Sequence, residues 1–311
     1  MGYGCRPALP LAGCLLALLL AGCEGEGEKR EAPDQPGADS LEDRAGRVLL
    51  AKKLKQAPDI DGQAEPLWDA LPGVELIAFH EAEETPITLK ACHDGKTLYL
   101  LAVWKDLDAS VEHKPWTWDE PQAKYIAGKE REDRLALEFA MSKTFDECMM
   151  GGTPYVADIW HWKACRTNPS GAVDEEWHKV ALDPFDVDGM EAISYANQGR
   201  DEETTLYMLR VKDKGAVAFK ELKPPAGKGE ARLPAFAPQT PDSGQADVKA
   251  KGAWKDGRWT LEFARALKAS RPDEDVTLKP GGHYFFAVAV FDKVSDEKHH
   301  TTPRGRLVLE K

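Results

Sequence analysis

The chain has 311 residues, and its 53 acidic residues outnumber the 41 basic ones to give a formal net charge of −12. This acidic balance argues against a nucleic-acid-binding protein, because contacts to phosphate groups require clusters of Lys and Arg. The length is sufficient for one domain with a sizeable hydrophobic core.

Residues 1–22 are predicted to be an export signal. Arg6 supplies the positive charge, and residues 12–21 form an apolar run that is too short to span a bilayer. The tetrapeptide Leu20-Ala21-Gly22-Cys23 resembles a bacterial lipobox, which implies cleavage before Cys23 and lipidation of that residue. We therefore expect a lipid-anchored, extracytoplasmic protein of the bacterial cell envelope, and Glu24 after the cysteine favours the outer membrane.

A disordered tether is predicted for residues 23–46, because they are rich in charge, Gly and Pro and have nothing to bury. The folded domain is then expected to occupy residues 47–311. Within it, residues from about 213 to 250 are rich in Lys, Pro, Gly and Ala. We interpret this stretch as a long surface insertion between two strands rather than as a separate domain.

Strand patterns dominate the predicted domain. Residues 87–104 have the pattern of a β-hairpin with its turn at Asp94-Gly95, and apolar residues on both faces of the second strand predict burial on both sides. Further strands are predicted at 133–141, 155–163, 191–196, 205–211, 258–264, 284–291 and 306–310. One helical turn is expected at 265–269. Many short strands with Gly and Asp turns indicate an all-β, antiparallel β-sandwich.

The segment from Cys148 to Gly171 concentrates the most unusual chemistry of the chain. It contains Met149-Met150, the triplet Trp160-His161-Trp162 and a second cysteine, Cys165. Methionine sulfur and histidine nitrogen are common axial ligands of haem iron, and tryptophans supply apolar walls. Cys148 and Cys165 are candidates for a disulfide in an oxidising compartment.

Sequence motifs limit the kind of chemistry that is expected. The chain has no CxxCH motif, so any haem would be bound non-covalently, as haem b. It also has no GxSxG, HExxH or P-loop motif, and no GxGxxG after a strand. The chain is therefore not expected to be an enzyme by itself, although it fits an electron-transfer subunit of an oxidoreductase.

Several motifs between about residue 56 and residue 310 together carry a family resemblance. They are Asp59-Ile60-Asp61-Gly62, Val103-Trp104-Lys105-Asp106, Asp133-Arg134-Leu135-Ala136-Leu137, Asp158-Ile159-Trp160-His161-Trp162-Lys163-Ala164, Trp254-Lys255-Asp256-Gly257-Arg258-Trp259 and Phe286-Ala287-Val288-Ala289-Val290. This series resembles the ethylbenzene dehydrogenase-related haem-binding domain, also described as the cytochrome c-552/DMSO reductase-like haem-binding domain. The resemblance implies a sandwich like that of family 9 carbohydrate-binding modules and DOMON domains, holding one b-type haem.

The resemblance also implies axial ligands for the haem iron. In the dehydrogenase subunits of the family these are a methionine and a lysine, and Met150 or its neighbour Met149 occupies the methionine position. His299 falls at the lysine position, so we expect Met150 and His299 as the metal ligands. Lys298 and His300 remain alternatives for the second ligand.

The Trp-His-Trp triplet has separate expectations for its members. Trp160 and Trp162 are predicted to line the haem slot as apolar walls. If the two tryptophans face one side of a strand, His161 faces the other. His161 is then either a core histidine or a hydrogen-bond donor to a haem propionate.

These observations predict a lipid-anchored b-type cytochrome domain that exchanges single electrons with a redox partner protein. A molybdenum-containing or cytochrome complex is the kind of partner that the resemblance implies. The alternative is a non-redox binding module on the same sandwich, for carbohydrate or another ligand. In that case exposed tryptophans such as Trp116 and Trp118 would stack on sugar rings.

Overall fold

The computed structural model describes residues 47–188 and 192–311. The predicted export signal, the lipidation site Cys23 and the tether lie outside these residues. Regular structure in the described part is almost entirely β strand, which confirms the all-β class. No helix among the described residues is long and apolar enough to cross a membrane.

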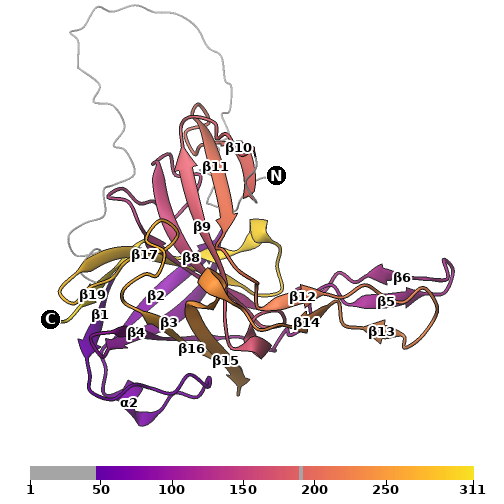
Figure 1. Ribbon diagram of the computed structural model, residues 1–311, viewed down its shortest axis with the longest axis horizontal. Helices are drawn as coiled ribbons and strands as arrows, with labels where there is room; N and C mark the ends of the chain where they lie inside the picture. Colours follow the sequence, from indigo (N-terminus) through magenta and orange to yellow (C-terminus); the bar gives the residue numbers. More distant parts are fainter. Residues whose placement is uncertain (1–46, 189–191) are drawn as a thin grey trace, which may run out of the picture.

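Within the described chain, fourteen strands form one continuous sheet (Figure 1). Its strands are β1 (Val48–Lys53), β2 (Gly73–His80), β3 (Glu83–His93), β4 (Thr97–Lys105), β7 (Arg134–Ala140), β8 (Tyr155–Lys163), β9 (Asp174–Ala181), β10 (Ala192–Gln198), β11 (Thr205–Lys212), β15 (Val248–Lys255), β16 (Arg258–Ala266), β17 (His283–Phe291), β18 (His300–Thr301) and β19 (Gly305–Leu309). The order is β10-β11-β9-β8-β7-β17-β18-β2-β3-β4-β16-β15, and β1 and β19 pair with each other beside β3 and β17.

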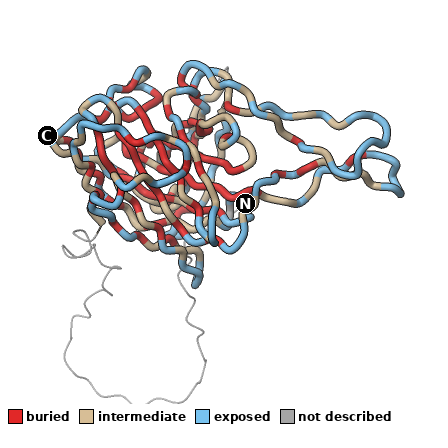
Figure 2. Tube along the Cα trace, turned by 90° about the horizontal axis from the view of Figure 1, so that it is seen from below, coloured by how far each residue is buried: buried red, intermediate tan, exposed pale blue. Residues whose placement is uncertain are grey.

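The two halves of this sheet fold over each other and enclose the main hydrophobic core. Trp162 of β8 packs against Trp104 of β4 and Trp259 of β16, with ring centroids 6.2 Å and 5.0 Å apart. Strands from opposite ends of the strand order therefore face each other, as in a β-sandwich. Figure 2 shows the buried segments gathered inside this body.

The β3–β4 hairpin illustrates why the sequence forms this architecture. Gly95 adopts a φ of +92° in the turn, a conformation that glycine tolerates without strain. Side chains of β4 then alternate: Leu98 and Leu100 enter the main core, whereas Leu101 packs in a separate cluster with Trp68. That tryptophan belongs to the short helix α2 (Pro66–Asp69), which covers the outer face of the hairpin. Both faces of β4 are buried, as predicted.

A slender arm projects from the sandwich. It contains β5 (Trp116–Asp119), β6 (Lys124–Ala127) and β13 (Arg232–Leu233), with β12 (Phe219–Glu221) and β14 (Phe236–Pro238) at its base (Figure 1). The segment 213–250 thus lies between β11 and β15 and supplies three short strands, one of which pairs with β5. Exposed and half-buried residues predominate along the arm in Figure 2.

Candidate functional site

A pocket lies on the outer face of the β7–β8–β17 part of the sheet, away from the main core. A second apolar cluster forms this face, and it includes Ile159, Ala287 and Phe291. The same residues line the pocket, together with side chains from two loops, one around Cys148 and Met149 and one around Asp296 and His299. Its cavity volume is about 100 Å³.

His161 of β8 projects into this pocket. Its side chain is buried, and its Nε2 atom has no hydrogen-bond partner among the described residues. Burial, reinforced by the positive charges of Lys163 and Arg134, lowers the pKa of His161 well below its usual value. The imidazole is therefore neutral, with its ring stacked on Phe291 at a centroid distance of 5.3 Å.

His299 reaches the same pocket from the loop after η3 (Asp296–Lys298). Its Nδ1 atom donates a hydrogen bond to the carbonyl oxygen of Asp296 at 2.6 Å, which leaves the lone pair on Nε2. The ring stacks on Phe291 at 4.9 Å, and burial lowers the pKa of His299. Phe291 therefore brings the two histidines, which are 138 positions apart in the sequence, to one apolar ring.

The two adjacent methionines occupy different positions. Met149 lines the pocket, and the hydroxyl of Tyr195 lies 3.9 Å from its sulfur. Met150 packs against the same apolar cluster but is not among the residues that form the pocket wall. Its carbonyl oxygen instead accepts a hydrogen bond from the backbone of Arg200 at 2.9 Å. The structure thus places Met149, rather than the preferred Met150, in the wall of the pocket that His299 also lines.

Ion pairs fix the loop that carries His299. Arg134 of β7 pairs with Asp296 at 2.5 Å, donates to the carbonyl of Val294 at 2.9 Å, and lies 4.0 Å from the ring centroid of Phe291. The sequence analysis missed this role, although Arg134 lies within one of the quoted motifs.

A second ionic group forms another part of the pocket edge. Glu176 of β9 accepts a hydrogen bond from Arg210 at 2.9 Å and lies 3.2 Å from His178. All three residues line the pocket. None of them was predicted, because isolated charged residues on strands give no sequence pattern that distinguishes them from surface residues.

The prediction that Trp160 and Trp162 line the slot is wrong. Both tryptophans are fully buried in the main core, whereas Ile159 and His161 face the pocket. Successive side chains of a strand point to opposite faces, so the triplet cannot place its tryptophans and its histidine on the same side. The expectation that His161 faces away from them is confirmed.

The remaining ligand candidates lie outside the pocket wall. Lys298 is exposed. His300 belongs to β18, accepts or donates a hydrogen bond with Thr85 at 2.8 Å, and stacks on His80 at 5.9 Å. Neither Lys298 nor His300 is therefore placed with His161, His299 and Met149 in the described structure.

The predicted Cys148–Cys165 disulfide is also wrong, because Cys165 is a free cysteine in the described part of the chain. Cys148 precedes β8 and Cys165 follows it. A nine-residue strand spans roughly 27 Å, whereas the Cα atoms of a disulfide lie about 5.5 Å apart. The extended strand therefore keeps the two cysteines at opposite ends.

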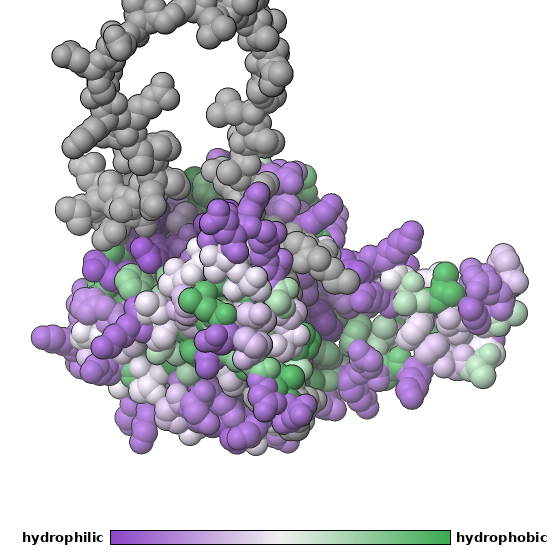
Figure 3. All heavy atoms as spheres, turned by 90° about the horizontal axis from the view of Figure 1, so that it is seen from above, coloured by the Kyte–Doolittle hydropathy of each residue, from purple (hydrophilic) through white to green (hydrophobic). Residues whose placement is uncertain are grey.

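Tryptophans offer no exposed platform for a sugar ring. All nine tryptophans of the chain lie within the described residues, and each is buried or half-buried. Trp116 and Trp118, on the arm, are half-buried, and Trp118 packs against Tyr125. Figure 3 shows a face on which hydrophilic residues predominate and apolar residues form small patches.

Fold and pocket together define an all-β sandwich domain with a buried pocket lined by histidine and methionine. The family model described as ethylbenzene dehydrogenase matches residues 54–302, which is most of the chain. The chain therefore belongs to the ethylbenzene dehydrogenase family, and the resemblance inferred from the sequence motifs is confirmed. The family is named after an oxidoreductase. No curated protein matches the chain.

Solved structures with a similar fold are carbohydrate-binding proteins. A family 9 carbohydrate-binding module from Caldicellulosiruptor kristjanssonii in complex with glucose is 11% identical, with a TM-score of 0.38 over 85% of this chain and 96% of that chain. A putative carbohydrate-binding protein from Bacteroides uniformis is 10% identical, with a TM-score of 0.42 over 85% and 99%. Scores this low carry no argument about ligand binding.

Proposed function

We propose that this chain binds one haem b non-covalently in the pocket and transfers single electrons. The observation that supports the proposal most directly is the meeting of His161, His299 and Met149 around one apolar pocket. Imidazole nitrogen and thioether sulfur are the side-chain groups that hold haem iron in electron-transfer proteins. Membership of the ethylbenzene dehydrogenase family supports the same function.

The residues of the pocket are suited to hold a haem. His161 is neutral and its Nε2 has no other partner within the described structure, and the Nε2 of His299 carries a lone pair. Ligand pockets usually measure about 300–1,000 Å³. The cavity, at about 100 Å³, is smaller than this, so binding of a macrocycle requires the pocket to widen.

Each side chain then has a separate task. His299 and Met149 are the residues that would hold the iron, so the methionine of the predicted pair is reassigned from Met150 to its neighbour. His161 is the alternative iron ligand to either His299 or Met149. Arg134 holds the His299 loop on the sheet through Asp296. Haem, when bound, supplies a one-electron couple, and the ligands and the burial set its potential.

We also propose that the chain acts at the membrane surface of the bacterial cell envelope. Lipidation of Cys23 would anchor it, most simply to the outer membrane, and a redox partner protein would dock on the exposed domain. The net charge of −12 favours a partner with a basic docking surface. The chain would then be an electron-transfer subunit rather than the catalytic one.

Single alanine variants of the protein, loaded with haem, test the ligand assignment. We expect the absorption spectrum of the reduced protein to lose its low-spin bands in His299→Ala and in Met149→Ala. Met150→Ala and His300→Ala are matched controls, because neither residue lines the pocket. Loss of the bands in a control, with retention in both pocket variants, would contradict the assignment. Loss in His161→Ala instead of His299→Ala would reassign the histidine ligand.

A further inference from the structure

A second group of buried carboxylates lies on the opposite face of β8 and β9 from the pocket. Oxygen atoms of Glu175, Asp213 and Asp275 all lie within 4.8 Å of one another. These residues are 0%, 3% and 1% exposed, so water does not screen their charges. Asp158 of β8 is also completely buried, and Arg265 connects it to the cluster, 3.9 Å from Asp158 and 3.1 Å from Asp275.

Most oxygen atoms of this cluster are unsatisfied. Oε2 of Glu175, both carboxylate oxygens of Asp213 and Oδ1 of Asp158 have no hydrogen-bond partner in the described structure. The oxygens of Asp275 likewise accept no hydrogen bond from any described residue, although one faces Arg265. A buried oxygen without a partner is costly, and native proteins leave few of them.

The charges of the cluster do not balance either. Four carboxylates face one guanidinium group, that of Arg265, within the described residues. Lys214, the next residue along the chain from Asp213, pairs instead with Glu274 at 3.4 Å.

Backbone contacts hold the carboxylates in place. Gln245 is completely buried, and its Nε2 donates to the carbonyl oxygens of Glu175 at 2.5 Å and Asp213 at 3.1 Å. The other oxygen of Glu175, Oε1, accepts from the backbone of Val248 at 2.8 Å. Contacts from Gln245 of η2 (Ser243–Ala246) and Val248 of β15 therefore hold Glu175 and the backbone at Asp213.

We propose that Glu175, Asp213 and Asp275 bind a divalent cation, Ca²⁺ in preference to Mg²⁺, with Asp158 beside the site. Ca²⁺ takes oxygen ligands at about 2.3–2.6 Å, so ligands on opposite sides of the ion are about 5 Å apart. The oxygens of the three carboxylates lie close enough together to contact one ion of this kind. Mg²⁺ demands shorter bonds and retains several waters, for which a fully buried carboxylate cluster is less suited.

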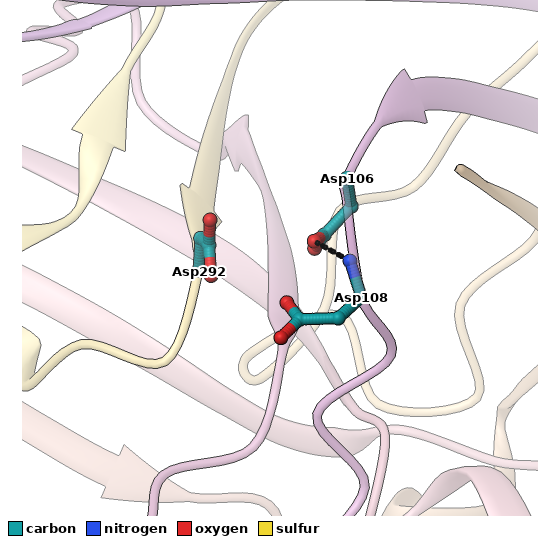
Figure 4. Close-up of side chains that lie close together, drawn as sticks. All are labelled: Asp106, Asp108 and Asp292. Carbon is teal, nitrogen blue, oxygen red and sulfur yellow. Dashed lines mark hydrogen bonds between the residues drawn. The ribbon is translucent and has the colours of Figure 1, made fainter.

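A surface cluster provides a matched comparison. Asp106, Asp108 and Asp292 also approach one another (Figure 4). Here Asp108 and Asp292 are exposed, and Lys293 forms an ion pair with Asp108 and lies 3.6 Å from Asp292. This cluster therefore has solvent and a protein cation to balance its charge, and Asp108→Asn serves as the control variant.

Calcium titration of the protein after EDTA treatment tests the proposal. We expect one Ca²⁺ per chain by isothermal titration calorimetry, and a rise in Tm of roughly 5 °C at 100 times Kd. Asp213→Asn and Asp275→Asn should each weaken binding at least tenfold, whereas Asp108→Asn should bind as the wild type does. Mg²⁺ at the same concentrations should raise Tm less.

Luminescence of Tb³⁺ gives a second readout that does not depend on the stability of the variants. The ring of Trp160 lies 5.7 Å from Arg265, which contacts Asp275, so excitation of tryptophan should sensitise Tb³⁺ in this site. Added Ca²⁺ should displace Tb³⁺ from the site and thereby reduce the luminescence. Wild-type protein that binds neither ion and shows no Ca²⁺-dependent change in Tm overturns the proposal. Loss of binding in Asp108→Asn alone overturns it equally.

Discussion

Trp162 closes the main core against β15 by lying directly on the backbone of Gly252. An added Cβ at position 252 would come within 2.5 Å of the Trp162 ring. Asn168 fastens this contact: its Oδ1 accepts from Nε1 of Trp162 at 3.0 Å and from the backbone of Gly252 at 2.7 Å. The strand therefore needs a residue without a side chain here.

We predict that Gly252→Ala lowers the free energy of unfolding by about 1–3 kcal/mol, because the buried ring cannot move aside. Urea unfolding followed by tryptophan fluorescence measures the change. Gly227→Ala is the control, since no atom lies within 4 Å of its added Cβ, and its effect should stay within about 0.5 kcal/mol. Equal stabilities of the two variants would show that the ring does not constrain position 252.

Asp133 is a buried carboxyl group with a shifted pKa. It is 1% exposed, and its Oδ2 accepts from the backbone of Ser110 at 2.6 Å and from Nε1 of Trp259 at 3.1 Å. Burial raises the pKa of Asp133 to about 7, against the effect of these hydrogen bonds. The folded protein therefore holds a proton at Asp133 that the unfolded chain releases near pH 4.

This shift predicts a loss of stability with rising pH. Below pH 4 the carboxyl group is protonated in both states, so its favourable contribution is fully present. Between pH 4 and 7 the unfolded chain binds fewer protons, and the contribution falls, by at most roughly 4 kcal/mol. Asp133→Asn should remove this part of the pH dependence. Thermal unfolding of the wild type and of Asp133→Asn at pH 5 and pH 8 measures this difference. An equal change in Tm between the two pH values for both proteins would contradict the raised pKa of Asp133.

At the residue scale, the sequence identified part of the site. The family resemblance pointed to His299 and to Met150, with Met149 as the alternative, and of these His299 and Met149 line the pocket. Trp160 and Trp162 were expected to line the haem slot, but the direction of a side chain on a strand depends on the register of that strand. Glu176 and Arg210 could not be predicted, because they acquire a role only when β9 and β11 pair.

At the element scale, the arm differs most from the rest of the protein. Its strands β5 and β6 bury few side chains and pair mainly with each other and with β13. Local opening requires little free energy where few buried contacts are lost. We therefore predict that backbone amides of β5 and β6 exchange with solvent at least roughly 100-fold faster than those of β7 and β8.

Hydrogen–deuterium exchange with peptide-level mass spectrometry measures this difference. The amides of β16 are a suitable reference, because β16 pairs with β4 on one side and β15 on the other. Equal protection of the arm and β16 would contradict the expectation and would indicate that the arm is an integral part of the core.

Strands were easier to predict than their ends. The hairpin of β3 and β4 and strands β7, β8, β16 and β17 follow from alternation and turn residues. The expected helical turn at 265–269 is wrong, since β16 continues to Ala266, where it pairs with Thr97 of β4, and none of residues 265–269 is helical. Arg265 remains extended because its guanidinium group reaches the buried carboxylates. Such tertiary contacts leave no periodic trace in the sequence.

At the scale of the whole molecule, the all-β class was predictable, whereas the way in which the fold assembles the two proposed sites was not. Two strands, β8 and β9, carry the proposed haem pocket on one face and the proposed cation site on the other. Each site also takes residues from loops that are distant in the sequence, such as those of His299 and Asp275. Only the folded sheet brings these segments together.

The central claim is that the pocket holds haem b. The most direct measurement is the absorption spectrum of the protein, purified from a bacterium that makes haem, before and after reduction with dithionite. We predict a Soret band, sharp α and β bands on reduction, and about one haem per chain. A protein that is colourless and stays so when haem is added would contradict the claim and favour a non-redox binding module.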